Sequence, residues 1–279
     1  MTCRLLGLGD NTVDTYVDRA LQFPGGNAVN VAVLAHRLGA ETGYMGCLGS
    51  DEAGTLIVNA LREEGVDTGR CRVLPGDNAR AFIGHNGNDR HFLRSQRGVR
   101  GEWGGFLSED LTYIAGFDLV HSSIYSELDA DLAALRPSIR RFSYDFSERW
   151  TEANLAATLP HLDIAFLSFP SSSDAECSDL ARRCFETGPG LVVVTRGERG
   201  SLALAGGVFH RHGITPAQIV DTLGAGDGFI AAFLLAVLEG REVPEALAAG
   251  AAHAAAVCAY QGGFGHGTPW SAAAEIAAC

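Results

Sequence analysis

Short apolar runs alternate with helix-like segments through most of this chain, and this alternation restricts the fold more than any other feature. The strand-like runs lie at residues 5–9, 44–49, 118–123, 141–146, 163–168 and 191–195. The main helix-like segments lie at residues 27–38, 51–64, 129–135, 152–159, 173–186, 228–238 and 245–260. Successive strand-then-helix units predict an α/β fold with a doubly wound, mainly parallel sheet. After Thr195 the chain turns directly into residues 202–204, which predicts an antiparallel edge.

A polar hairpin interrupts this pattern. Residues 81–85 and 91–94 flank a turn that contains Asn86-Gly87, a strong hairpin signal. We therefore predict one α/β domain over residues 1–270, with β-lid segments at about 14–24 and 79–103 inserted and a C-terminal tail at 271–279. Arg90 in the hairpin is a candidate to bind a phosphate or carboxylate of a substrate. The alternative, a solvated lid charge, is the more common case.

Composition excludes several classes of partner. Among the 279 residues, 47% are hydrophobic and the formal net charge is −12, which argues against nucleic acid or an anionic membrane as the main partner. A nucleotide remains compatible, since one local turn can bind a phosphate on an acidic protein. The seven cysteines include no C-x-x-C pair, and no signal peptide or long apolar run is visible. We expect a cytoplasmic protein with reduced thiols.

A glycine-rich turn at residues 221–227 opens the apolar helix at 228–238. Backbone N–H groups at a helix start have no helical acceptor and favour an anion, and Gly224, Ala225 and Gly226 let a phosphate approach closely. Asp227 would stand beside that anion, able to accept a proton. The alternative is an ordinary loop that ends in a capping Asp.

A second glycine-rich turn, Gly25-Gly26, opens the helix at 27–38. Asn27 and Asn30 are three residues apart and can both face this turn, where their amides could hydrogen-bond sugar hydroxyls. Asp10 and Asp14 follow the first strand, at the end of a parallel sheet where ligands usually bind. Capping and tight packing are the alternative roles of all these side chains.

The chain resembles the PfkB, or ribokinase-like, family of carbohydrate kinases in both of these turns. Gly25-Gly26 followed by Asn30 matches one family signature, and residues 221–227 match the other. A P-loop motif is absent, and Gly7-x-Gly9 lacks the third glycine of a dinucleotide-binding dehydrogenase. The resemblance extends from residue 5 to about 270 and includes the lid. Several stretches are most similar to the fructoselysine 6-kinases of the family: 9–11 with 13–14, 26–33, 88–90, 145–147 with 150, and 160–163.

This resemblance implies a role for each matching residue. Asp227 would be the base for the sugar hydroxyl, and the N–H groups of Ala225, Gly226 and Asp227, in the turn with Gly224, would bind the transferring phosphoryl group. Asp221 stands where the family often has a monovalent-cation ligand, such as one for K⁺. The residues that would hold the sugar are Asp14, Gly26 and Asn30. The residues that would form the nucleotide-binding turn are Thr195, Gly197 and Gly200.

Two departures from the family pattern stand out. The family's Asn-x-x-Glu motif, which helps to organise magnesium and phosphates, falls at Ser168-Phe169-Pro170-Ser171 and keeps neither residue. We therefore expect Mg²⁺ to arrive with ATP, held mostly by phosphate oxygens and water. Gly228 stands where a serine is frequent.

The function expected from this resemblance is ATP-dependent phosphorylation of the 6-hydroxyl of fructoselysine or a related fructosamine. Acids at strand ends, namely Asp10, Glu127 and Asp145, are candidates to meet the ammonium groups of such a substrate, although loop capping is preferred for Glu127. One alternative is a plain sugar or nucleoside as substrate, such as ribose, fructose or adenosine. The other is a catalytically silent sugar- or nucleotide-binding protein. A homodimer through the lid is also expected.

Overall fold

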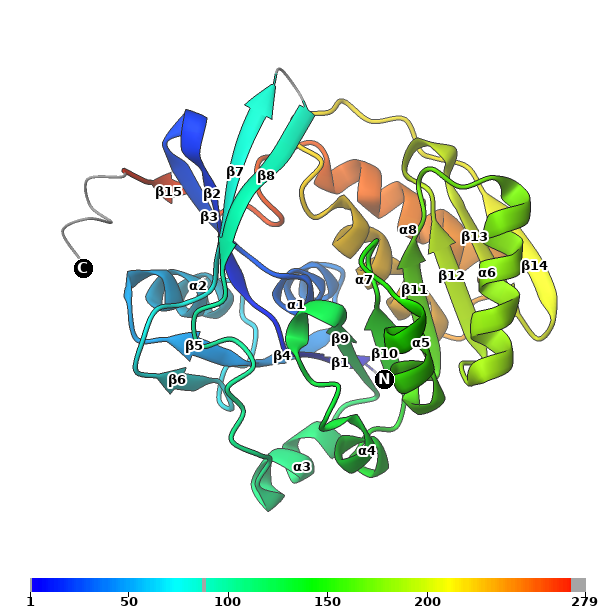
Figure 1. Ribbon diagram of the computed structural model, residues 1–279, viewed down its shortest axis with the longest axis horizontal. Coiled ribbons are helices and arrows are strands. Elements are labelled where there is room, and N and C mark those ends of the chain that lie inside the picture. Colours follow the sequence, from blue (N-terminus) through cyan, green and yellow to red (C-terminus); the bar gives the residue numbers. More distant parts are fainter. Residues whose placement is uncertain (1, 87–88, 272–279) are drawn as a thin grey trace.

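The computed structural model describes residues 2–86 and 89–271, and of residues 86, 89 and 90 it describes the backbone alone. Within these residues the main sheet has the order β14-β13-β12-β11-β10-β9-β1-β4 (Figure 1). All its neighbours are parallel except β12–β13 and β13–β14. The predicted α/β fold and its antiparallel edge are confirmed. The strands are β1 (Arg4–Leu8), β4 (Glu41–Met45), β9 (Leu119–Ser123), β10 (Phe142–Asp145), β11 (Ile164–Ser168), β12 (Leu191–Thr195), β13 (Ser201–Ala205) and β14 (Val208–His212).

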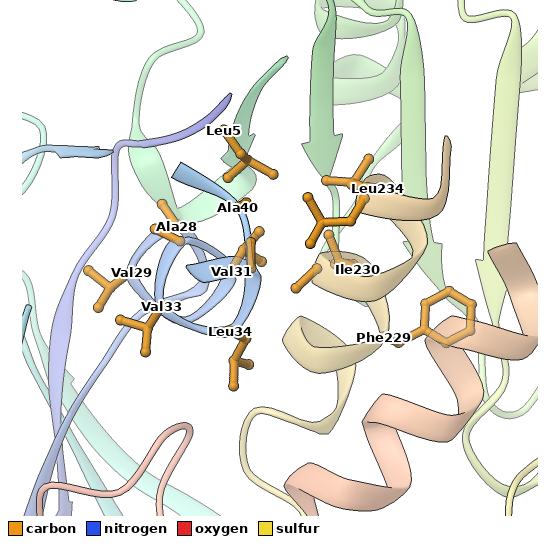
Figure 2. Packing of buried hydrophobic residues seen from close by; sticks show 14 of the residues in the cluster. Leu5, Ala28, Val29, Val31, Val33, Leu34, Ala40, Phe229, Ile230 and Leu234 are labelled. Carbon is orange, nitrogen blue, oxygen red and sulfur yellow. The ribbon is translucent and has the colours of Figure 1, made fainter. Parts of the chain in front are cut away.

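Helices cover both faces of this sheet because side chains alternate between the faces along each strand. Leu5 of β1 packs in one buried cluster with α1, α2, α7 and α8, and its neighbour Leu6 packs in another with α3 to α6. Figure 2 shows the first cluster, with Val31 of α1 near Ile230 and Leu234 of α7. The helices are α1 (Asn27–Arg37), α2 (Glu52–Glu63), α3 (Ser108–Ala115), α4 (Leu132–Leu135), α5 (Glu152–Thr158), α6 (Asp174–Thr187), α7 (Ala225–Leu238) and α8 (Val243–Val257).

Local capping explains where several helices begin and end. Asp51 accepts a hydrogen bond from the Gly54 N–H at 2.9 Å, which caps α2. Ser173 and Glu176 form a reciprocal capping box at the start of α6. Short 3₁₀ turns fill other connections: η1 (Val17–Arg19), η2 (Ile124–Ser126), η3 (Arg136–Ser138), η4 (Leu159–His161) and η5 (Gly197–Arg199).

A second sheet, of order β15-β3-β2-β7-β8, contains the segments predicted as a lid and is called the lid sheet below. The hairpin of β7 (Arg80–Asn86) and β8 (Asp89–Gln96) lies where the sequence predicts one and projects from the body (Figure 1). Its other strands are β2 (Thr12–Tyr16), β3 (Leu21–Gly25) and β15 (Thr268–Pro269). Asp14 therefore lies inside strand β2. Gly25 likewise ends a strand.

Two predictions of secondary structure have the wrong bounds. The single strand predicted at 44–49 is divided between β4 and β5 (Cys47–Gly49), and β5 pairs with β6 (Arg72–Leu74) in a separate sheet. The helix predicted at 129–135 ends at Leu135 as expected but begins only at Leu132, because residues 129–131 form a turn, and η3 follows it directly. Among the described residues, no helix is long and apolar enough to cross a membrane.

Candidate active site

The two glycine-rich helix starts meet at the Asp227 carboxylate. Asn27 Nδ2 donates to Asp227 Oδ1 at 2.7 Å, and Asn30 Nδ2 donates to Asp227 Oδ2 at 2.6 Å. Asn27 and Asn30 lie in the first turn of α1, and Asp227 lies in the first turn of α7. The structure thus brings together residues that are about 200 positions apart in the sequence. The amides hold the carboxylate in one orientation beside the N-terminus of α7.

Asn27 also connects Asp227 to a second carboxylate and to a buried histidine. Its Nδ2 also donates to Asp145 Oδ2 at 3.0 Å, so the two hydrogens of this amide bind the carboxylates of Asp145 and Asp227. Its Oδ1 lies 2.9 Å from Nε2 of His121, and His121 Nδ1 lies 3.0 Å from Ser143 Oγ. Since the Asn27 oxygen can only accept, Nε2 of His121 must carry the proton. Burial lowers the pKa of His121 to about 3, so this histidine is neutral.

Asp145 ends β10 and has a perturbed acidity. Burial raises the pKa of its carboxyl to about 7, and the negative charges of Asp227 and Asp10 act in the same direction. A hydrogen bond from the Ser147 N–H at 2.8 Å opposes this increase. A perturbed pKa in a carboxyl beside a second carboxylate is common at functional sites.

Sequence reasoning missed His121 and named Asp145 only as a candidate for substrate ammonium groups. His121 lies in the buried strand β9 and is fully buried. A polar side chain at that point in an apolar strand is the signal that could have found it.

Asp10 stabilises the start of α1. Its carboxylate accepts hydrogen bonds from the N–H groups of Asn27 at 2.7 Å and Ala28 at 3.2 Å, and also from the hydroxyls of Ser123 at 2.7 Å and Ser126 at 3.2 Å. Only 3% of the residue is exposed. The two N–H groups hold the start of α1 at the carboxyl end of β1, and the two hydroxyls hold the Asp10 carboxylate in place. A direct contact of Asp10 with substrate stays a prediction.

Asp14 and Gly26 lie on the lid side of the same site. Asp14 is buried on β2, and a side chain at Gly25 would collide with its carboxylate. Gly26 has φ +109, and a Cβ there would lie 2.6 Å from the Asn11 Cα, so only glycine fits. Both residues lie close to Asn30. The Asn30 N–H donates to the Gly26 carbonyl at 2.8 Å, and Asp14 lies beside Gly25 of the same glycine-rich turn. The side chain of Arg90 lies outside the described residues.

The turn before α7 is closely packed at Gly224 and open at Gly226. Gly224 has φ +78, and a Cβ there would lie 2.6 Å from the Gly263 Cα. The Ala225 N–H donates to the Thr222 carbonyl at 3.3 Å, so this one of the predicted donors is engaged within the turn. The N–H groups of Gly226 and Asp227 lie in the first helical turn, where the helix itself offers no acceptor. A Cβ at Gly226 would meet no atom within 4 Å, which leaves that side of the turn open.

Asp221 lies at the start of this turn and is buried, and its carboxylate connects three segments of the chain by hydrogen bonds. It accepts hydrogen bonds from the Tyr16 hydroxyl on β2, from the Leu223 N–H at 2.9 Å and from the Gly262 N–H at 3.0 Å. This donor set suits a structural carboxylate better than a dedicated cation ligand. Within the described part of the chain, no group of three or more His, Cys, Asp or Glu residues could hold a metal ion.

The predicted nucleotide turn lies at the carboxyl end of β12, the same end of the parallel strands as Asp10 and Asp145. Thr195 ends β12, Gly197 begins η5, and Gly200 follows η5. Residues 168–171, where the family motif is missing, connect neighbouring strand ends. The Ser168 N–H donates to the Ser147 carbonyl at 2.8 Å, and the Phe169 N–H donates to the Thr195 carbonyl at 2.9 Å.

Comparison with known proteins identifies the family. Residues 4–269 match the model of the pfkB family of carbohydrate kinases. The chain belongs to this family. It is 39% identical over 270 residues to the fructosamine kinase FrlD of Bacillus subtilis (strain 168), covering 96% of this chain and 95% of that protein. It is 35% identical over 260 residues to the fructoselysine 6-kinase of Escherichia coli (strain K12), covering 93% and 99%.

Solved structures of pfkB-type kinases share the fold. The ribokinase of Arabidopsis thaliana, complexed with ribose and ATP, matches with a TM-score of 0.83 at 23% identity, over 97% of this chain and 96% of that chain. A fructokinase from Vibrio cholerae, with fructose, ADP and potassium bound, matches with a TM-score of 0.74 at 21% identity, over 99% and 98%. At these identities the match supports the fold alone. The family membership makes this chain a carbohydrate kinase.

Proposed function

We propose that this kinase transfers the γ-phosphoryl group of ATP to the 6-hydroxyl of fructoselysine or a related fructosamine. The observation that carries the chemistry is the Asp227 carboxylate, held by Asn27 and Asn30 at the first turn of α7. The choice of substrate is supported by the relatives named for fructosamine and fructoselysine, which align over nearly the whole chain.

The reaction follows from this geometry. Asp227 accepts the proton of the 6-hydroxyl as the hydroxyl oxygen bonds to the γ-phosphorus, and the bond from that phosphorus to the bridging oxygen of ADP breaks. The N–H groups of Gly226 and Asp227, with the dipole of α7, stabilise the negative charge of the transferring group. Asn27 and Asn30 orient the base, and Asp14 and Gly26 lie where they can position the sugar. Thr195, Gly197 and Gly200 would bind the nucleotide.

Metal ions receive no step in this proposal. The described residues offer no protein cage for Mg²⁺, and Ser168 and Ser171 replace the family's Asn and Glu. Magnesium would instead be bound by the phosphates of ATP and by water, where it would neutralise phosphate charge. A potassium site at Asp221 stays a prediction, since three donors already converge on that carboxylate.

A substrate panel tests the proposal. ADP formation is measured with fructoselysine, other fructosamines, fructose, ribose and adenosine, and kcat/KM is compared. We expect the highest value for a fructosamine. The rival, a kinase for a plain sugar, has support from a fructokinase of Klebsiella pneumoniae that is 31% identical over 278 residues. Turnover of fructose, ribose or adenosine without turnover of any fructosamine would establish the rival.

The lid dimer is also a proposal. Strand β8 forms the edge of the lid sheet, and Phe92 and Leu93 on it are exposed at 65% and 54%. An exposed edge strand with apolar side chains favours pairing with another strand. Sedimentation velocity should give twice the chain mass, and a single species at 29.4 kDa would contradict a dimer.

A further inference from the structure

A charged cavity of about 290 Å³ is lined mainly by the segments that follow β9 and β10, and Asp145 ends β10. Arg100 and Arg149 line it, together with Glu127, Asp129 and Tyr125. Two guanidinium groups and two carboxylates in one small cavity are unusual for a site that would hold a neutral sugar. The cavity therefore needs its own explanation.

Hydrogen bonds connect this cavity to the proposed phosphoryl-transfer site. The Tyr125 hydroxyl donates to Ser147 Oγ at 2.9 Å, and the Ser147 N–H donates to Asp145 Oδ1 at 2.8 Å. Asp145 in turn accepts from Asn27, which holds Asp227. Arg149 lies four residues after Asp145 on the same connection. A substrate with its sugar at Asp227 could extend from Asp145 towards this cavity.

The four charges form two functionally different sets. Glu127 is neutralised within the protein, because its carboxylate pairs with Arg97 at 2.7 Å and with Arg100 at 3.3 Å. Arg149 and Asp129 make no ion pair with any of the described residues. The Arg149 guanidinium lies 5.9 Å from the centre of the Tyr125 ring, and Asp129 Oδ1 accepts from the Tyr144 hydroxyl at 3.3 Å. One cation and one anion thus line the cavity without a counterion from the described chain.

We infer that this cavity binds the amino-acid end of a glycated amino acid, with the carboxylate at Arg149 and the α-ammonium group at Asp129. The inference rests on the proposed function and names the part of the substrate that lies beyond the sugar. A zwitterion satisfies both charges at once, whereas a purely anionic or cationic group would meet one of them with like charge. The planar Arg149 guanidinium suits a carboxylate. The Tyr125 ring and Ile124 offer apolar contact for the methylene groups of a side chain.

Three substrates of equal chain length test this assignment. They are fructoselysine, the fructose adduct of 1,5-diaminopentane, which lacks the carboxylate, and the fructose adduct of 6-aminohexanoic acid, which lacks the α-ammonium group. The variants are Arg149→Met and Asp129→Asn. Arg182→Met is the matched control, since Arg182 is an exposed arginine on α6 paired with Asp179. Circular dichroism and thermal melting confirm that each variant is folded.

We expect Arg149→Met to lower kcat/KM by about tenfold for the two substrates that carry a carboxylate, mainly through KM, and to leave the diaminopentane adduct within about twofold. Asp129→Asn should lower kcat/KM for the two substrates that carry the second ammonium group and spare the 6-aminohexanoate adduct. Arg182→Met should change none of them. If Arg149→Met and Asp129→Asn affect all three substrates alike, or none, the inference is wrong while the proposed function stands. If the wild type phosphorylates no fructosamine, both fail.

Discussion

At the scale of single residues, the Asp227 carboxylate is the centre of the site because both of its oxygens accept hydrogen bonds from amides of α1. The same Asn27 amide also contacts Asp145, and His121 fixes which way that amide points. Four side chains from α1, α7, β9 and β10 therefore depend on one another. Each of them can be tested separately.

Replacing Asp227 by Asn removes the proposed base while it keeps the shape of the side chain. We expect kcat to fall by about 10²- to 10⁴-fold, the usual contribution of a general base. ATP binding, measured by calorimetry, should persist, because the nucleotide turn at 195–200 is unchanged. Activity within tenfold of the wild type would exclude Asp227 as the base.

Replacing His121 by Leu tests whether the orientation of Asn27 matters. The change leaves Asn27 Oδ1 and Ser143 Oγ without their histidine partner, and we expect a loss of about 2 kcal/mol in the free energy of unfolding. We also expect kcat to fall by about tenfold, because Asn27 loses the donor that anchors its oxygen and its Nδ2 is then held less firmly against Asp227. His121→Gln, which keeps a side-chain donor, should recover part of kcat. Equal kcat in the Leu and Gln variants would contradict the positioning role.

Asp145 should make stability depend on pH in a predictable direction. Its pKa is about 7 in the folded protein against an ordinary value of 3.8, so between these values the folded state holds a proton that the unfolded state releases. Stability contributed by this group is therefore present at low pH and lost as pH rises towards 7. Asp145→Asn lacks this titration. Urea unfolding at pH 5, 6, 7 and 8 should show the variant gaining stability relative to the wild type as pH rises, and a difference independent of pH would refute the shifted pKa.

At the scale of elements, close packing of α7 against α8 explains why Gly228 stands where the family often has a serine. A Cβ at Gly228 would lie 2.6 Å from Val257 Cγ2 and 3.5 Å from His253 Cδ2 on α8. Val257 is fully buried, so it cannot move aside freely. The space that a side chain at position 228 would need is thus already occupied by Val257 of the neighbouring helix.

Gly228→Ser should lower the free energy of unfolding by about 1–3 kcal/mol, as expected for overpacking in a core. Val257→Ala alone should also destabilise the protein, since it leaves a cavity. The double variant should lose less than the sum of the two single losses, because each change relieves the other. Chemical denaturation of the four proteins measures this coupling, and strictly additive losses would show that the two residues do not compete for space.

The sequence predicted some helices and strands correctly and missed others. The parallel strands, most of the helices and the β7–β8 hairpin were predicted because each depends on a local pattern of apolar residues, capping or turn residues. The division of 44–49 into β4 and β5 was missed, since it depends on which sheet each half joins. Strand β15 was missed for the same reason, as Thr268 pairs with Gln22 far away in the sequence.

At the scale of the whole molecule, the site exists only because distant segments meet. The two glycine-rich turns were recognised separately from the sequence, but their shared contact at Asp227 required the packing of α1 against α7 (Figure 2). The role of His121 as partner of Asn27 could not be predicted, because the two residues are more than 90 positions apart in the sequence. The role of Asp10 as partner of α1 could not be predicted either, because it depends on backbone N–H groups of α1 and on the distant Ser123 hydroxyl. Glu127 pairs with arginines that follow the lid hairpin and does not cap a loop as preferred from the sequence.

The most direct test of the central claim is a competition experiment with the wild-type kinase. Limiting ATP is supplied with equal concentrations of fructoselysine, fructose and ribose, and the phosphorylated products are identified by ³¹P and ¹³C NMR. The account predicts that most of the phosphate is found on the 6-hydroxyl of fructoselysine. Phosphate mainly on fructose or ribose, with fructoselysine left unreacted, would contradict it.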